Sequence, residues 1–71
     1  MKLNEREEIV GTLVDINAEN RNLILTFGIS KRLELPASAI PKEKLQALVG
    51  TRIGLLHLDG KEYRIRTVRQ R

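Results

Sequence analysis

The chain has 71 residues, of which 41% are hydrophobic and 31% are charged, and its formal net charge is +4 with a pI of about 10.0. This length and composition fit one soluble domain, residues 1–71, and exclude a disordered chain. Cysteine is absent and there is one histidine, which excludes disulfides, thiolate metal sites and histidine-rich metal sites. The basic balance raises the expectation of an anionic partner.

The sequence also indicates where the protein resides. No apolar run approaches the roughly 20 residues that span a bilayer, and residues 1–5 lack the apolar core of a signal peptide. We therefore expect a cytoplasmic protein without membrane contact, and we predict no metal and no cofactor. Residues 1–7 are mainly polar, and we expect them and residues 69–71 to be flexible.

The first predicted strand starts at Glu8 and continues to Ile16, with β-branched residues on both faces. Gly11 inside this run indicates a bulge or a sharp bend. Residues 17–22 contain three asparagines, a composition typical of turns and loops.

Residues 23–27 and 32–35 predict the second and third strands. In both segments every second residue is apolar, which indicates strands with one buried face. Gly28 bends or ends the earlier strand, a tight turn has its tip at 30–31, and Pro36 ends the later strand because proline cannot donate to a ladder.

The period changes to a helical one between residues 37 and 50. Pro41 suits the first turn of a helix, and the apolar residues at 45, 48 and 49 form one helical stripe. Gly50 then provides a C-terminal stop. A helix this short must dock its stripe on the sheet to be stable.

The last third of the chain predicts a β-hairpin, with strands over 52–57 and 61–68. Asp59-Gly60 lies between them, and this dipeptide between two runs of β-formers is a strong hairpin signal. The turn length decides which face carries the arginines.

A two-residue turn over 59–60 would place Arg64 on the same face as Leu55, which makes a poor core. A three-residue turn over 58–60 pairs Leu55 with Tyr63 instead. Because a slip of one residue moves every side chain to the other face, the apolar pattern selects this second register. It gives the hairpin one apolar face and one basic face.

The predicted order is three strands, one helix and two strands. Short strands with tight turns and a single helix predict an all-β fold: a five-stranded small barrel, SH3-like or Sm-like, or OB-like, with the helix between strands 3 and 4. The predicted core consists of Ile9, Leu13, Leu23, Leu25, Phe27, Leu33, Leu35, Leu45, Leu48, Ile53, Leu55, Tyr63 and Ile65.

Three arginines of the hairpin form the main candidate site. In the chosen register Arg52 and Arg66 lie opposite each other and Arg64 lies on the same outer face, where they could pair with phosphates. Directly opposed arginines repel, so we expect a counter-charge there, either a protein carboxylate or a phosphate. The alternative is a solvated strand face that Glu62 and neighbouring acids partly balance.

Other cations extend this candidate site. Lys31 and Arg32 lie in the second turn and could lengthen the basic strip, although lysines at turn tips are usually only solvated. Arg69 and Arg71 belong to a basic tail that adds nonspecific attraction.

The remaining residue types argue against catalysis. His57, placed beside Lys61, has no nucleophile or carboxylate pair nearby and is predicted to be structural. No glycine-rich phosphate loop or nucleophile motif is present, so we do not expect an enzyme. The aromatic residues Phe27 and Tyr63 are assigned to the core, which argues against a platform for base stacking. We therefore expect any nucleic acid to be bound mainly through its backbone.

The first hairpin resembles the first motif of the Sm-like family over about fifteen residues. Gly11, Leu13 and Asn17 precede Asn22-Leu23-Ile24-Leu25, although Asn17 stands where the family has an aspartate. Residues 55–60 loosely resemble the second motif, with Leu58-Asp59 in place of the family's arginine. The resemblance implies ring oligomers that bind single-stranded RNA, with Asn22 contacting a base.

Two functions follow as expectations. The first is a small basic barrel that binds nucleic acid, RNA in preference to DNA, mainly through backbone contacts. The alternative is a structural or protein-interaction module that forms a homo-oligomer or part of a larger complex. It is suggested by the small core, by Ile24 and Leu56 on outer faces, and by an exposed edge strand.

Overall fold

The computed structural model describes residues 1–69. It contains the strands β1 (Glu8–Glu19), β2 (Asn22–Phe27), β3 (Lys31–Pro36), β4 (Arg52–Asp59) and β5 (Glu62–Thr67), and the helix α1 (Lys42–Gln46). The strands form one five-stranded antiparallel sheet in the order β3-β2-β1-β4-β5. The predictions of a mainly β fold and of a helix between the third and fourth strands are confirmed.

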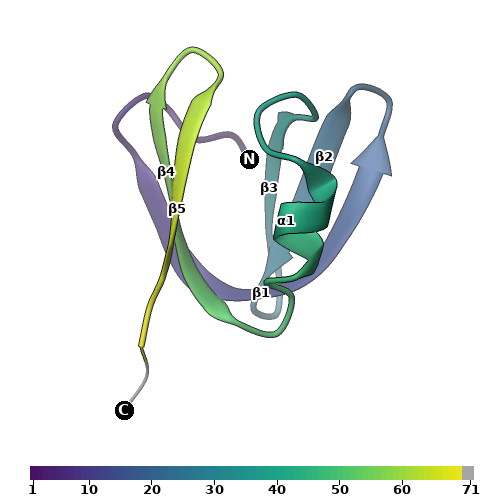
Figure 1. Cartoon of the computed structure of the whole chain (residues 1–71), viewed down its shortest axis with the longest axis vertical. Helices are drawn as coiled ribbons and strands as arrows, with labels where there is room; N and C mark the ends of the chain where they lie inside the picture. The colour runs from purple at the N-terminus through teal and green to yellow at the C-terminus, as the bar shows by residue number, and fades with distance from the viewer. Residues whose placement is uncertain (70–71) are drawn as a thin grey trace.

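Strand β1 belongs to both halves of the sheet. Its first part, up to Thr12, pairs with β4, and its second part, from Leu13, pairs with β2. Figure 1 shows β1 curving beneath the molecule, with β4 and β5 on one side and β2 and β3 on the other. The irregularity in pairing lies between Leu13 and Asp15 and not at Gly11, where the sequence suggested it. This bulge lets one strand serve two half-sheets.

The sheet is curved but open. Strand β4 follows β3 in the chain but lies beside β1. The first four strands therefore have the spatial order β4-β1-β2-β3, which is a Greek key. Strands β3 and β5 form the two edges and are not paired with each other.

The core fills the space between the half-sheets. Its buried residues are Leu3, Ile9, Leu13, Ile16, Leu23, Leu25, Phe27, Leu33, Leu35, Ile40, Leu45, Ile53 and Leu55. Leu48, Tyr63 and Ile65, which were assigned to the core, are only partly buried and pack against its side. The predicted core residues of β2, β3 and β4 are all buried, whereas Ile16 of β1 is buried although it was not predicted to be.

Residues 1–7, here called the N-terminal segment, cross the open end of the sheet. The Glu34 N–H of β3 donates to the Met1 carbonyl (2.8 Å), and the Arg6 N–H donates to the His57 carbonyl of β4 (2.7 Å). Between these contacts Leu3 is 7% exposed and joins the core. No sequence pattern predicts this docking, because one apolar residue among polar ones has no periodicity. Of the predicted flexible end 69–71, residues 70 and 71 lie outside the described range.

Helix α1 is shorter than the predicted 41–50 segment. It ends at Gln46 and buries Leu45 alone, whereas Val49 is exposed. Gly50, with φ of +91°, donates its N–H to the Leu13 carbonyl (2.7 Å). The chain must leave the helical path early to reach this bond at the bend of β1. Among residues 1–69 no helix has the length and apolar character needed to cross a membrane.

The β4–β5 hairpin keeps the predicted faces but not the predicted pairs. Leu55 pairs with Ile65 and His57 pairs with Tyr63, and an irregularity lies between His57 and Asp59. The prediction that Leu55 pairs with Tyr63 is therefore wrong by two residues. A shift of two preserves the side on which each residue lies, so the apolar and basic faces remain where the sequence placed them.

Candidate functional site

The outer faces of β1, β4 and β5 form a continuous surface that contains the predicted arginines. Ile53 and Leu55 of β4 are buried, so the alternating residues Arg52, Gly54 and Leu56 point away from the core. Gly54 pairs with Arg66 and Leu56 pairs with Arg64. We call the outward residues of β1, β4 and β5 the outer face.

Arg52 and Arg66 are not opposite each other, which corrects the expected repulsive pair. Gly54 is the partner of Arg66, and the Arg52 carbonyl accepts a hydrogen bond from the Val68 N–H (2.9 Å). The cause is the two-residue difference in hairpin register.

Arg66 has a carboxylate partner from the first strand. Its Nε donates to Glu8 Oε2 (3.0 Å) and its Nη2 donates to Glu8 Oε1 (3.2 Å), which is the two-pronged geometry that arginine favours. The hydrogen bond from Arg66 lowers the pKa of Glu8, and the same bond raises the pKa of Arg66. The pair crosses over Gly54, where an added Cβ would lie 2.8 Å from Glu8 Oε2. A glycine at this position therefore leaves room for the ion pair.

Arg52 and Arg64 keep their charge uncompensated. Among the ion pairs of residues 1–69, none joins a carboxylate to Arg52 or Arg64 within 4.0 Å. Arg64 is exposed and Arg52 is half-buried. The expected counter-charge is thus present for Arg66 and not for the other two arginines.

Arg52 and Lys31 line one cleft. It is formed by residues 10–12 of β1, by Arg52, and by residues 27–31 at the β2–β3 turn, and its volume is about 430 Å³. The Gly28 N–H donates to the Thr12 carbonyl (2.9 Å), and this bond joins the turn to β1. No carboxylate is among the lining residues. We call this hollow the basic cleft.

Arg32 and Arg69 lie elsewhere. Arg32 pairs with Thr26 of β2 and lines a separate hollow with Glu19 and Glu34, so it does not extend the basic strip beside Lys31. Arg69 is exposed beyond the end of β5. The structure thus joins Lys31 with Arg52 and separates both from Arg32.

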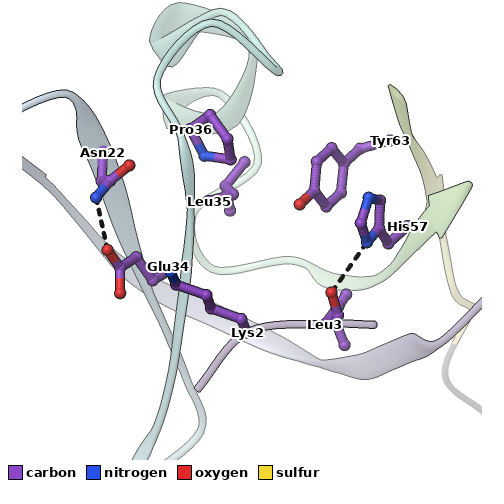
Figure 2. Close-up of a pocket in the computed structure, with 8 residues that line it drawn as sticks. All are labelled: Lys2, Leu3, Asn22, Glu34, Leu35, Pro36, His57 and Tyr63. Atoms are coloured by element: carbon purple, nitrogen blue, oxygen red, sulfur yellow. Dashed lines mark hydrogen bonds between the residues drawn. The ribbon is translucent and has the colours of Figure 1, made fainter. Parts of the chain in front are cut away.

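Asn22, the residue that the Sm-like resemblance implies as a base contact, lies at the other end of β2 from the basic cleft. The five steps along the six residues of β2 separate the two sites by about 16 Å at 3.3 Å per step. Figure 2 shows the Asn22 amide donating to the Glu34 carboxylate at the side of a cavity of about 200 Å³. Asn22 is therefore engaged within the fold and is remote from Arg52.

His57 and Tyr63 lie across the same cavity, facing Asn22 and Glu34 (Figure 2). Their rings are stacked, with centroids 4.4 Å apart and an interplanar angle of 8°. Tyr63 is partly buried, and burial raises its pKa. The argument that the aromatics are hidden in the core holds for Phe27, which is buried, but not for Tyr63.

The His57 ring joins two distant carbonyls, a role that the sequence did not reveal. Its Nδ1 lies 2.9 Å from the Leu3 oxygen and its Nε2 lies 2.8 Å from the Gly60 oxygen. A neutral imidazole has a single N–H, so donation to both carbonyls requires the protonated ring. The bond to Gly60 is the main cause of the raised pKa of His57. This role of His57 could have been predicted only from the docking of Leu3. No local pattern in the sequence indicates that docking.

Comparison of the chain with protein-family models, with curated proteins and with solved structures gives no match. Within residues 1–69, no three side chains of the metal-ligating types come together. The candidate function therefore depends on the charges of the outer face and on the basic cleft.

Proposed function

We propose that this protein binds nucleic acid, RNA in preference to DNA, through the phosphates of the backbone and without catalysis. The observation that carries the proposal is the basic cleft, where Arg52 and Lys31 meet with no carboxylate among the lining residues. Arg64 adds a further exposed cation on the outer face. The net charge of +4 favours the approach of an anionic polymer.

We further propose that the curved sheet is a small open barrel of the OB-like class. The Greek-key order β4-β1-β2-β3 supports this, because OB-folds are partly open five-stranded Greek-key barrels that bind oligonucleotides. The same order favours the OB-like alternative over the SH3-like and Sm-like ones. An Sm-like ring with Asn22 on a base stays a prediction from sequence alone.

The proposed binding is electrostatic in origin. Each cation that neutralises a phosphate releases condensed counterions, which lowers the slope of log K against log salt by about 0.7 for a single strand. Three cations, Arg52, Arg64 and Lys31, give a slope of about −2. Contacts of this kind position the strand and do not read its sequence, so mixed sequences should bind with similar affinity.

Fluorescence anisotropy with a labelled mixed-sequence RNA of about ten nucleotides, a length within the range of one small binding domain, tests the proposal. Arg64→Glu should weaken binding strongly at low salt. Lys44→Glu is the matched control, since it makes the same charge change at an exposed position of α1, away from the outer face. Equal loss in both variants would show that only net charge matters, and unchanged binding in Arg64→Glu would remove Arg64 from the proposed binding surface.

A second candidate, a protein-interaction module that forms a homo-oligomer, is favoured by the open sheet. Strand β5 has β4 on one side only, and an unpaired edge can accept another strand. Ile24 and Leu56, expected to be exposed, are half-buried, so they offer less apolar surface than predicted. Light scattering across a range of protein concentrations tests this candidate, because a mass that stays monomeric at every concentration contradicts a homo-oligomer.

A further inference from the structure

Ile29 is the most exposed large hydrophobic residue in the described part of the chain, with a relative exposure of 102%. It lies between Gly28 and Ser30 in the β2–β3 turn, where glycine, asparagine, aspartate and serine are the usual residues. Single exposed apolar residues are common and need no explanation by themselves. Ile29, however, lies in the basic cleft together with Val10, which is 40% exposed.

The basic cleft therefore combines two kinds of chemistry. Val10 and Ile29 provide apolar surface, and Lys31 and Arg52 provide positive charge, with no acidic side chain in the lining. Its volume of about 430 Å³ lies within the range of sites for small ligands. Charge complementarity selects an occupant that is anionic and has an apolar part.

One nucleotide of a single strand has both properties, since a phosphate is joined to a base with apolar faces. Isoleucine is among the apolar side chains that insert between the base steps of a duplex and partly unstack them, so an aliphatic side chain can contact the face of a base. A base inside a duplex is stacked and paired and cannot enter a concave site of this size, whereas a base of a single strand can be splayed out.

We propose that the basic cleft seats one unstacked nucleotide of a single-stranded nucleic acid, with the base against Ile29 and Val10 and the flanking phosphates on Lys31 and Arg52. This inference rests on the proposed function and makes it more specific. It gives the exposed side chain of Ile29 a role in binding, whereas a proposal based on charge alone gives it none. It also requires preference for single strands over duplexes.

The test compares Ile29→Ser with Val14→Ser in anisotropy titrations against a short mixed-sequence RNA and against its duplex. Val14 is the matched control, because it is a β-branched residue that is 43% exposed but does not line the cleft. Ile29→Ser should weaken single-strand binding by up to about fivefold, the low end of the effect of losing an aromatic stacking contact with one base, because isoleucine has no aromatic ring. The slope of log K against log salt should not change, because no charge is removed.

The possible results separate this inference from the function on which it rests. If Ile29→Ser binds like the wild type while Arg64→Glu binds weakly, the nucleotide site is wrong and the electrostatic function stands. Equal affinity for duplex and single strand would also overturn it. If the wild type binds no RNA, both proposals fail, and Ile29-dependent binding of an acidic, leucine-containing peptide would then identify the cleft as a protein site.

Ile29→Ser and Val14→Ser should both melt like the wild type, since each side chain is substantially exposed. Val10→Ser is a second variant among the residues that line the cleft, on β1, and it should also weaken single-strand binding. Normal binding by both variants would refute the apolar contact.

Discussion

Replacing Glu8 with glutamine should strengthen RNA binding and steepen its salt dependence. In the wild type the Glu8 carboxylate holds Arg66 through two hydrogen bonds of 3.0 and 3.2 Å, so this arginine is neutralised before any phosphate arrives. Glu8→Gln removes the negative charge and leaves Arg66 free beside Arg64 on β5. The outer face then gains one uncompensated cation.

The size of the effect follows from counterion release. One further phosphate contact changes the slope of log K against log salt by about −0.7, from about −2 to about −2.7. Over a salt range from about 50 to 200 mM, the loss of affinity should therefore be larger in Glu8→Gln than in the wild type by about 2.6-fold. Titrations of labelled single-stranded RNA at a series of salt concentrations measure both slopes.

Two comparisons make this prediction refutable. Glu43→Gln makes the same charge change on α1, away from the outer face, and should leave the slope near the wild-type value. Arg66→Gln should leave the slope near −2 in the wild type, because Arg66 makes no phosphate contact there, although the change exposes the Glu8 carboxylate. In the Glu8→Gln background the same change should return the slope from about −2.7 to about −2, because the free arginine is lost. Equal slopes in Glu8→Gln and the wild type would refute the reasoning, as would an Arg66→Gln effect that is the same in both backgrounds.

Three other outcomes follow from the geometry. Leu45→Ala should cost about 2–5 kcal/mol of unfolding free energy in urea titrations, because Leu45 is fully buried and is the one buried residue of α1; a cost below about 1 kcal/mol would contradict its place in the core. Gly54→Ala should raise the pKa of Glu8 toward its ordinary value in a carboxyl NMR titration, because the new Cβ would lie 2.8 Å from Glu8 Oε2 and 3.1 Å from Arg66 Nε. A Glu8 pKa equal to that of the wild type would show that the ion pair survives the substitution. The pKa of His57 is raised above 6.5 in the folded protein. The contribution of His57 to stability should therefore be complete below pH 6.5 and should be lost as the pH rises through the pKa of the folded state. Comparing the unfolding free energies of His57→Gln and the wild type across this range checks the sign, and a pH-independent difference would count against the two carbonyl contacts.

The faces of the strands could be read from the sequence because they depend on a period of two. Leu23, Leu25 and Phe27 alternate with polar or less buried residues, and all three are buried. The same period explains why the last hairpin was assigned the correct faces and the wrong partners. A register error of two residues leaves every side chain on its own side, so the position of Arg64 on the outer face could be predicted while the neighbour of Arg66 could not.

The contacts that the sequence did not reveal join residues that are distant in the chain. Glu8 and Arg66 are separated by 58 positions, and they meet only because β1 and β5 both flank β4. Leu3 and His57 are separated by 54 positions, and the docking of Leu3 depends on the open end of the sheet. No local period encodes either contact, so the neutralisation of Arg66 and the engagement of the histidine required the fold.

The candidate site could also be predicted only in part. Charge and alternation placed Arg52 and Arg64 on one outer face, but chain proximity grouped Lys31 with Arg32. Neighbouring residues in a strand point to opposite faces, and the structure joins Lys31 with Arg52 in the basic cleft and leaves Arg32 beside Glu34.

The most direct test of the central claim is the affinity of the wild-type protein for a short single-stranded RNA, measured as a function of salt. If Arg52, Arg64 and Lys31 each neutralise one phosphate, log K should fall linearly with log salt with a slope of about −2. An affinity that does not change with salt, or the absence of binding at about 50 mM salt, would contradict the proposal that the outer face and the basic cleft bind nucleic acid.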